Sequence, residues 1–202
     1  MIEILVMRHG QSMGDIENRH EGRADLELTE LGREQARKAA RWIARHYPPD
    51  SIYASPLRRA AVTAEFLAAE TAAPLIYDDD LRELDNGHQA GLTFEEADRR
   101  FPELRTRLKP HQPYPGGESD IAFRARAEIA WQRILESTPP DSRIAIVAHG
   151  AIISRLFQCF LRLPLPSHVR LQSDDTGIHL WRIEDDDRWV VFSNRTEHLA
   201  DG

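Results

Sequence analysis

The chain has one cysteine and no long apolar run, and each shortage excludes a class of protein. Cys159 is the only cysteine among 202 residues, so an intramolecular disulfide or a cysteine-rich zinc site is impossible. Its apolar surroundings predict a place in the core. No apolar run approaches the ~20 residues of a membrane-spanning helix. No secretory signal pattern opens the chain, so we expect a cytoplasmic protein that does not bind membranes.

Lysine and net positive charge are also scarce. The net charge is -7 at pH 7, which argues against a nucleic-acid partner, because contacts to a phosphate backbone need a basic stripe. Lys38 and Lys109 are the only lysines, so arginine supplies nearly all the positive charge. An anionic ligand must therefore bind where arginine side chains supply a local positive charge. There is no G-x-x-x-x-G-K-[ST] loop, which argues against an ATP-dependent kinase.

Two apolar segments end in a histidine followed by a glycine. Residues 2–7 lead into Arg8-His9-Gly10, and residues 143–148 lead into His149-Gly150. Open α/β sheets bind their ligands beyond the carboxyl ends of the strands. We therefore expect the two histidines to share one pocket.

Strand-like and helix-like segments alternate along the rest of the chain. Ser55 resembles an N-cap, with Pro56 in the first turn of a helix that continues through Ala68. The other expected helices cover residues 29–45, 93–101, 119–134 and 152–161. The expected strands cover residues 2–7, 51–54, 75–77, 143–148, 169–172, 177–183 and 189–192. This order predicts one α/β domain over residues 1–202: a three-layer α/β/α sandwich whose sheet is mostly parallel, with an antiparallel edge hairpin.

Two long loops interrupt this alternation. Residues 11–27 show no periodicity, and residues 109–117 contain three prolines and two glycines. Loops of this length in a compact domain are frequently functional.

A set of motifs resembles the histidine phosphatase superfamily, whose best-known branch is the cofactor-dependent phosphoglycerate mutases. Each motif is weak alone, but their order and spacing are specific. They are Arg8-His9-Gly10-Gln11-Ser12; Gly22, Asp25, Leu28-Thr29 and Gly32 through Gln35-Ala36; Ser55-Pro56-Leu57-Arg58-Arg59-Ala60; Leu81-Arg82-Glu83 with Gly87 and Gly91; Pro115-Gly116-Gly117-Glu118-Ser119; and His149-Gly150.

The resemblance implies phosphoryl transfer through a covalent intermediate on His9. A neutral imidazole can attack phosphorus and hold the phosphoryl group, which divides one difficult displacement into two easier ones. Nearby arginines keep the imidazole neutral, because like charges disfavour imidazolium. Cations must also stabilise the charge on the transferring group. The resemblance assigns that work to Arg8, Arg59 and His149.

Two further assignments depend on the family pattern. Arg58 and Arg59 point about 100° apart in the first turn of a helix, so only one can face a ligand there. The family pattern selects Arg59, and we expect Arg58 at the surface. The resemblance also makes Glu83 the group that protonates the leaving oxygen and later activates water.

The wider set of candidate phosphate- and substrate-binding residues adds Gln11, Asp15, Glu21, Gly22 and Gly150. Asp15 is a departure, because the family usually has an asparagine there that donates a hydrogen bond to the phosphate. A carboxylate would repel a phosphate dianion. Asp15 can therefore turn to an arginine, bind a protonated phosphate, or leave the phosphate shell to Asn18.

The remaining histidines show no paired metal-ligand spacing, so we expect no metal site. His20, in the first long loop, is a candidate for substrate contact. Surface or half-buried positions are expected for His46, His88, His111, His168, His179 and His198.

The segment after Glu83 favours a phosphatase over a mutase. Family mutases carry arginine and tyrosine just after the glutamate, to hold a substrate carboxylate, whereas residues 84–87 here are Leu-Asp-Asn-Gly. Mutases also have a longer insertion before the Gly-Gly-Glu segment, and only 24 residues separate Gly91 from Gly116. A shorter lid admits water and favours hydrolysis.

We therefore expect a metal-independent phosphomonoesterase of the histidine acid type that hydrolyses small phosphorylated metabolites and needs no cofactor. Leu84 and residues 87–92 and 109–114 are expected to border the leaving group. Two alternatives stay open. One is a cofactor-dependent phosphoglycerate mutase. The other is a non-catalytic phospho-ligand binding module on the same fold, which is suggested by a carboxylate at Asp15 that does not suit catalysis. The terminal hairpin leaves an edge that could pair in a homodimer.

Overall fold

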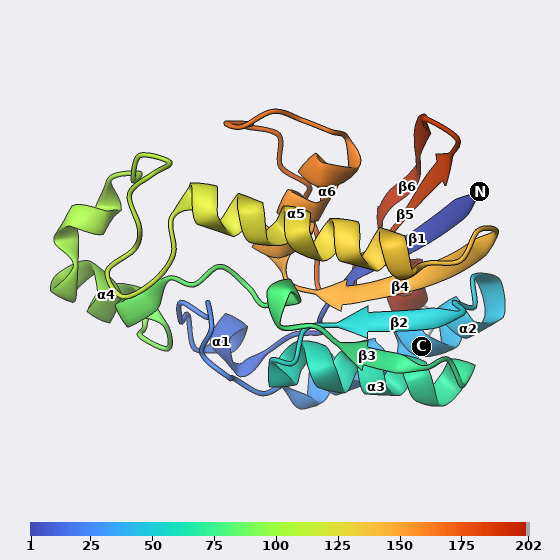
Figure 1. The fold of residues 1–202 in the computed structure, drawn as a ribbon. Helices are drawn as coiled ribbons and strands as arrows, with labels where there is room; N and C mark the ends of the chain where they lie inside the picture. The colour runs from blue at the N-terminus through green and yellow to red at the C-terminus, as the bar shows by residue number, and fades with distance from the viewer. Residues whose placement is uncertain (201–202) are drawn as a thin grey trace.

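The computed structural model describes residues 1–200, which form a six-stranded mixed sheet between two layers of helices (Figure 1). The strands are β1 (Ile2–Arg8), β2 (Ser51–Ala54), β3 (Leu75–Tyr77), β4 (Ser142–Ala148), β5 (Ile178–Glu184) and β6 (Asp187–Arg195). They lie in the order β3-β2-β4-β1-β5-β6. β1 to β4 run parallel to one another, β5 pairs antiparallel with β1, and β6 pairs antiparallel with β5. The expected sheet with its antiparallel edge hairpin is confirmed.

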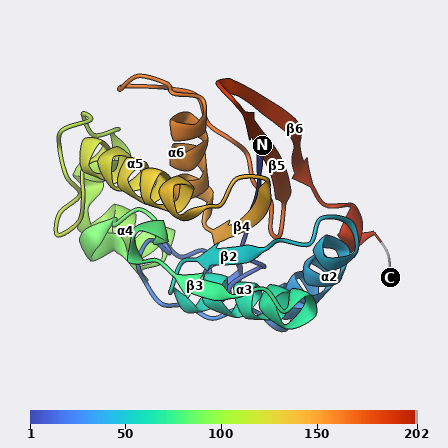
Figure 2. The same ribbon diagram turned by 45° about the vertical axis from the view of Figure 1, so that its right-hand side comes forward.

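Four long helices cover the two faces of the sheet (Figure 2). They are α2 (Glu30–His46), α3 (Arg58–Thr71), α5 (Asp120–Ser137) and α6 (Gly150–Phe160). Ile4 and Val6 of β1 belong to the core with α5 and α6, whereas Leu5 and Met7 belong to the core with α2 and α3. A strand buried on both faces gives a continuous apolar run rather than an alternating one. This packing is the predicted three-layer sandwich.

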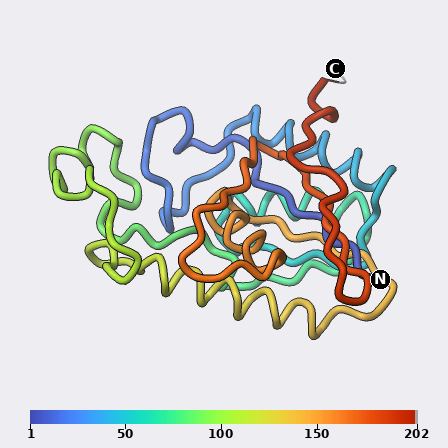
Figure 3. Tube along the Cα trace, turned by 90° about the horizontal axis from the view of Figure 1, so that it is seen from above, coloured from blue at the N-terminus to red at the C-terminus, as the bar shows by residue number. Residues whose placement is uncertain are grey.

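The long connections carry shorter elements that meet at one end of the molecule (Figure 3). The first loop contains α1 (Met13–Ile16). Loop residues that come after α1 pair with the segment just before α4 (Phe94–Arg100). A β-bridge joins Arg19 to Thr93, and His20 N–H donates to the carbonyl of Leu92 at 2.9 Å. The 3-10 turns are η1 (Asp79–Leu81), η2 (Gly87–Gln89), η3 (Pro102–Arg105) and η4 (Glu197–Leu199).

The helix starts agree with the sequence at three of four positions. Thr29, Thr93 and Ser119 cap α2, α4 and α5 through their side chains. The expected Ser55 cap is wrong, because α3 begins at Arg58 with Leu57 as an N-cap that makes no side-chain bond. The Ser55 hydroxyl has a buried partner elsewhere, described below.

The strand expected at residues 169–172 is also wrong. This segment lies beside α6 and bonds to side chains of that helix, so its backbone has no strand partner. Leu171 N–H donates to Ser154 Oγ at 3.1 Å, and the carbonyl of Val169 accepts from Gln158 Nε2 at 2.6 Å. The neighbouring position on the sheet belongs to β5, which pairs with β1.

The outer strand β6 forms one edge of the sheet. Trp189, Val190 and Val191 are exposed on it. The homodimer inferred from this edge stays a prediction. No helix within residues 1–200 is long and apolar enough to cross a membrane.

Three parallel strands deliver polar side chains to one edge of the sheet. β1, β4 and β2 are in register, with Arg8 opposite Ala148 and Ala54 opposite Val147. The next residues are His9, His149 and Ser55. Because these strands are adjacent and parallel, their following residues must come together.

Candidate active site

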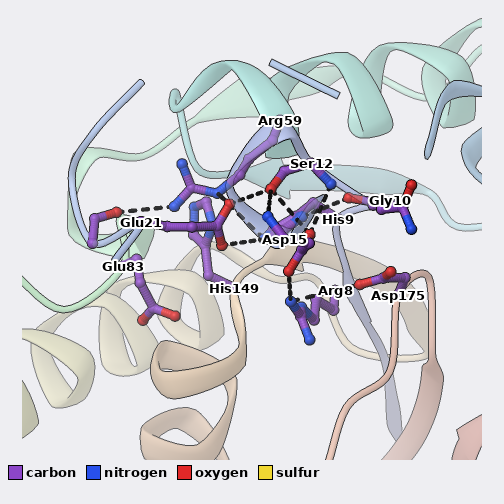
Figure 4. Close-up of polar contacts among 12 residues, drawn as sticks. Arg8, His9, Gly10, Ser12, Asp15, Glu21, Arg59, Glu83, His149 and Asp175 are labelled. Atoms are coloured by element: carbon purple, nitrogen blue, oxygen red, sulfur yellow. Dashed lines mark hydrogen bonds and ion pairs between the residues drawn. The ribbon is translucent and has the colours of Figure 1, made fainter. Parts of the chain in front are cut away.

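His9 lies at the end of β1 with its imidazole buried and directed at Arg59 (Figure 4). Its Nδ1 is 2.8 Å from the carbonyl of Gly10, so Nδ1 carries the proton and Nε2 keeps a lone pair. Arg59 Nε donates to that Nε2 at 3.3 Å. Burial lowers the pKa of His9 well below its usual range, and Arg59 and Arg8 lower it further. The ring is therefore neutral, and its Nε2 lone pair faces Arg59.

Arg59 is fully buried in the first turn of α3 and is held from three sides. Its Nη1 donates to the carbonyl of Ala24 at 2.8 Å, and its Nη2 donates to the carbonyl of Gly22 at 2.9 Å. Both acceptors belong to the first long loop. Arg58 is exposed, as expected. The structure thus brings Arg59, and not Arg58, to His9.

Arg8 approaches the same space from the end of β1. Its Nη1 donates to the carbonyl of Ser173 at 3.2 Å, and its Nη2 lies 3.2 Å from Asp15 Oδ1 and 3.5 Å from Asp175 Oδ1. Its Nε is buried and has no hydrogen-bond partner among residues 1–200. Arg8 therefore retains one free donor in a buried position.

His149 is the second imidazole of the site. Its ring centroid lies 5.1 Å from that of His9, and its Nε2 lies 2.8 Å from Ser55 Oγ. Its buried Nδ1 has no partner within the described residues. Burial lowers the pKa of His149 well below its usual range, with further lowering by Arg59, His9 and Arg8. A buried polar atom without a partner needs a ligand to bind it.

Asp15 turns to an arginine, the first of the three expected possibilities. It bonds to Arg8, and its other oxygen accepts from Ser12 N–H at 2.8 Å within the capping box of α1. This carboxylate is therefore fixed by a cation and by a helix start. Asn18 has a positive φ of 52°, and its backbone carbonyl accepts from Phe94 N–H, at the start of α4, at 2.9 Å.

Glu21 points into the centre of the site, between Ser12, Arg59 and His9 (Figure 4). Its Oε2 is 3.8 Å from His9 Nε2, and its Oε1 is 3.4 Å from Arg59 Nε and in short contact with Ser12 Oγ. The single Ser12 hydroxyl proton cannot serve both this contact and the 3.0 Å contact with Asp15 Oδ2. A proton on Glu21 satisfies both. Burial raises the pKa of Glu21, which favours that neutral form.

Glu83 points away from His9, toward the amino end of α6 (Figure 4). Its Oε1 accepts from Leu84 N–H at 2.8 Å and Ile152 N–H at 3.0 Å, and its Oε2 accepts from Ala151 N–H at 2.9 Å. Within residues 1–200 no hydrogen bond or ion pair joins it to the other candidate catalytic side chains. Its role in proton transfer stays a prediction.

Of the three remaining candidates, Gly22, Gly150 and Gln11, only Gly22 lines the small cavity beside the site. Gly22 has φ +46°, and a Cβ there would lie 1.8 Å from Asn86 Oδ1, so only glycine fits. Gly150 begins α6 directly after His149. The Gln11 side chain turns away from His9, since its Oε1 accepts from Thr29 Oγ1 at 2.9 Å.

Some histidines lie elsewhere than the sequence suggested. His179 and His198 were expected at or near the surface but are buried, with Nε2 atoms 2.7 Å from Ser173 Oγ and 2.9 Å from Thr176 Oγ1. Burial lowers the pKa of each to about 4. His20 packs edge-on against Phe94, at a centroid distance of 4.8 Å. It lines the small cavity beside the site.

That cavity has a volume of about 370 Å³, and its walls include Asp15, Glu21, Glu83, Asn86 and Phe94. No group of three metal-ligating side chains occurs within residues 1–200. Sequence reasoning missed two contributors, Ser55 and Asp175. Ser55 could have been found by the argument that found the histidines, because it too follows a core strand. Asp175 gave no such signal.

The site thus places arginines around a neutral, buried imidazole at the carboxyl edge of a sheet covered on both faces, and sequence comparison shows the family to which such a chain belongs. The chain belongs to the histidine phosphatase superfamily (branch 1), whose sequence model matches residues 4–196. It is 35% identical over 173 residues to glucosyl-3-phosphoglycerate phosphatase of Mycobacterium tuberculosis, covering 80% of this chain and 76% of that protein. It is also 31% identical over 195 residues to phosphoglycerate mutase-like protein 4 of Arabidopsis thaliana, covering 94% and 83%.

Solved structures show the same fold. A mycobacterial glucosyl-3-phosphoglycerate phosphatase in complex with VO3 superposes with a TM-score of 0.81 at 30% identity, covering 95% of this chain and 98% of that one. Phosphoserine phosphatase of Entamoeba histolytica with 3-phosphoglyceric acid gives a TM-score of 0.78 at 25% identity, covering 98% and 100%. These relatives are phosphatases that act on or bind small phosphorylated molecules.

Proposed function

We propose that this chain is a metal-independent phosphomonoesterase that hydrolyses small phosphorylated metabolites through a phosphohistidine on His9. The observation that carries the proposal is the lone pair of His9 Nε2, buried beside the guanidinium of Arg59 with the nitrogen position fixed by Gly10. A nucleophile with a fixed lone pair next to a fixed cation is the arrangement that attack on a phosphate anion needs.

In the first half-reaction, the Nε2 lone pair of His9 forms a bond to phosphorus while the bond from phosphorus to the leaving oxygen breaks. Arg59, the free Nε of Arg8 and the unpartnered Nδ1 of His149 supply donors for the phosphoryl oxygens. When the Ser55 hydroxyl donates a hydrogen bond to His149 Nε2, the ring proton is on Nδ1, which can then donate to the phosphoryl group. The donors are in place before the substrate arrives, so little reorganisation is required.

The leaving oxygen takes a proton from a carboxyl group, and the family resemblance assigns this to Glu83. Glu83 and Glu21 both line the small cavity. Release from the amides of α6 would let Glu83 turn toward the leaving group. Glu21 lies 3.8 Å from His9 Nε2, and in its neutral form it adds no negative charge that would repel the phosphoryl group.

In the second half-reaction, water attacks phosphorus, the bond from phosphorus to Nε2 breaks, and the carboxylate takes the water proton. This returns inorganic phosphate and neutral His9. The Nδ1–H bond to the Gly10 carbonyl stabilises the ring while it carries the phosphoryl group. The phosphatase relatives support hydrolysis over return of the phosphoryl group to a second substrate.

The test is phosphate release from a panel of phosphomonoesters by wild type and His9→Ala, with and without chelator. We expect release that persists in chelator and is lost in His9→Ala, together with an acid-labile phosphoenzyme in wild type alone. His111→Ala, an exposed histidine on the second long loop, is the matched control. Loss of activity in chelator contradicts a metal-independent mechanism. Interconversion of phosphoglycerates without phosphate release indicates a mutase, and binding without turnover indicates a non-catalytic module.

A further inference from the structure

A second cavity of about 980 Å³ opens beside the catalytic cavity and shares Leu84 and Ala151 with it. It also borders Gly150, the residue after His149. Its volume is at the upper end of the range for small-molecule sites. A leaving group that extends from the phosphate past Leu84 would enter this space.

The cavity is positively charged although the chain as a whole carries -7. Its walls include Arg107, Lys109, Arg155 and Arg170, and Asp120 is the one acidic residue that lines it. Asp120 is already paired with Arg155. No ion pair within residues 1–200 engages the other three cations. A cleft lined by one sign of charge concentrates ligands of the opposite sign.

Arg155 lies at the centre of this charge. It is half-buried on α6, stacks over the Phe123 ring at 5.7 Å, and donates from Nη1 to Gln158 Oε1 at 3.0 Å. Burial lowers the pKa of Arg155, Asp120 raises it, and Arg170 and Arg107 lower it. These cations line one cavity, and an anion bound among them would offset their mutual repulsion.

Three of the four cations come from two loops that are anchored to the helices. The carbonyl of Pro110 accepts from Ile121 N–H at 3.0 Å, which ties the loop carrying Arg107 and Lys109 to the start of α5. Ser154 of α6 holds the loop carrying Arg170, because its Oγ donates to the carbonyl of Leu171 at 3.0 Å. The charges are therefore positioned by the fold.

We propose that this cavity is a subsite for a second anionic group on the substrate, so that the enzyme prefers phosphomonoesters whose leaving group ends in a phosphate or carboxylate. The inference depends on the proposed function only for its kinetic consequence. The binding consequence can be measured on its own.

The binding test compares alkane bisphosphonates with ω-hydroxyalkyl phosphonates of the same chain length, using calorimetry on the wild-type protein. Phosphonates resist hydrolysis, so the measurement does not require turnover. We expect the bisphosphonate to bind at least about tenfold more tightly at the best spacer length, because each charge-assisted contact contributes more than a neutral one. An ω-carboxyalkyl phosphonate then distinguishes a phosphate-binding from a carboxylate-binding subsite.

The variants separate the subsite from the catalytic residues. Arg107→Ala/Arg170→Ala should remove most of the tenfold preference and leave hydroxyalkyl phosphonate binding unchanged. Both side chains are exposed and without ion pairs in the described chain, so folding should be preserved, which a melting curve checks. Arg105→Ala is the control, since Arg105 lies on the same segment, pairs with Asp98 and does not line the cavity.

The kinetic arm uses the corresponding alkanediol bisphosphates and hydroxyalkyl monophosphates. Equal affinity for both phosphonates overturns the subsite whether or not the protein hydrolyses anything. Discrimination without hydrolysis supports the subsite and contradicts the proposed phosphatase. A preference that survives in Arg107→Ala/Arg170→Ala also overturns the assignment.

Discussion

Glu21→Gln tests the idea that the carboxyl group at the centre of the site works in its neutral form. Glutamine keeps the shape of glutamic acid and its ability to donate a hydrogen bond, but it cannot ionise. Ser12 and Arg59 contact this carboxyl, so the substitution removes one ionisable group from a fixed network.

The magnitude follows from the 3.8 Å between Glu21 Oε2 and His9 Nε2, the atom that would bind phosphorus. A carboxylate at that separation repels each unit of phosphate charge by about 4 kcal/mol at an effective dielectric constant of about 20. This corresponds to about a thousandfold in kcat/KM. Burial raises the pKa of Glu21, so the acid is neutral at low pH and ionises as the pH rises through that raised pKa. Activity should therefore fall as the pH rises.

The assay is kcat/KM for phosphate release as a function of pH in wild type, Glu21→Gln and Glu30→Gln. Glu30 lies exposed at the start of α2, so its variant makes the same chemical change outside the site. We expect wild type and Glu30→Gln to lose more activity at alkaline pH than Glu21→Gln, in which the proposed acid Glu83 still ionises but position 21 does not. The same alkaline decline in all three, or inactivity of Glu21→Gln at acid pH, refutes the reasoning.

Two further predictions concern buried histidines. Ser55→Ala should lower kcat/KM about fivefold with little change in melting temperature, because His149 loses its partner and net hydrogen-bond contributions are about 1 kcal/mol; an equal loss in stability would show a structural role instead. His179 and His198 have their pKa values lowered to about 4, so the unfolded chain binds more protons below the usual value of 6.5. As the pH falls from 6.5 to about 4, the free energy of unfolding should therefore decrease by up to about 3 kcal/mol per histidine. Chemical denaturation at several pH values, with His198→Gln, should show a shallower decline in the variant, and equal slopes would contradict the assignment.

The sequence was sufficient to bring His9 and His149 together because both follow apolar strands, and ligand sites in open α/β sheets lie at one edge. The same rule extends to Ser55, where local preference misled the prediction. A serine before a proline is typical of an N-cap, yet a buried imidazole needs a hydrogen-bond partner more than this helix needs a cap. Tertiary contact therefore outweighed the local pattern.

The orientations of the acidic side chains could not be predicted from the sequence. Glu21, Asp15 and Glu83 are separated along the chain, and each direction depends on contacts with distant residues. The Asp15 carboxylate is oriented by its contact with Arg8, whereas the Glu83 carboxylate is oriented by the backbone amides at the start of α6. The expected strand at residues 169–172 failed for the same reason, since side chains of α6 satisfy its backbone. Residue spacing carries no information about such partners.

His9 and His149 follow adjacent strands, whereas most of the cations of the second cavity are carried by two surface loops. If both proposals hold, the reaction and the choice of substrate are encoded by separate stretches of the chain. The tips of these loops, residues 106–112 and 164–170, lie outside the strand ladder and include neither Ser173 nor Asp175, which contact Arg8. Under the proposed function, replacing these two short stretches is the way to redirect phosphate-ester selectivity with the paired histidines left in place.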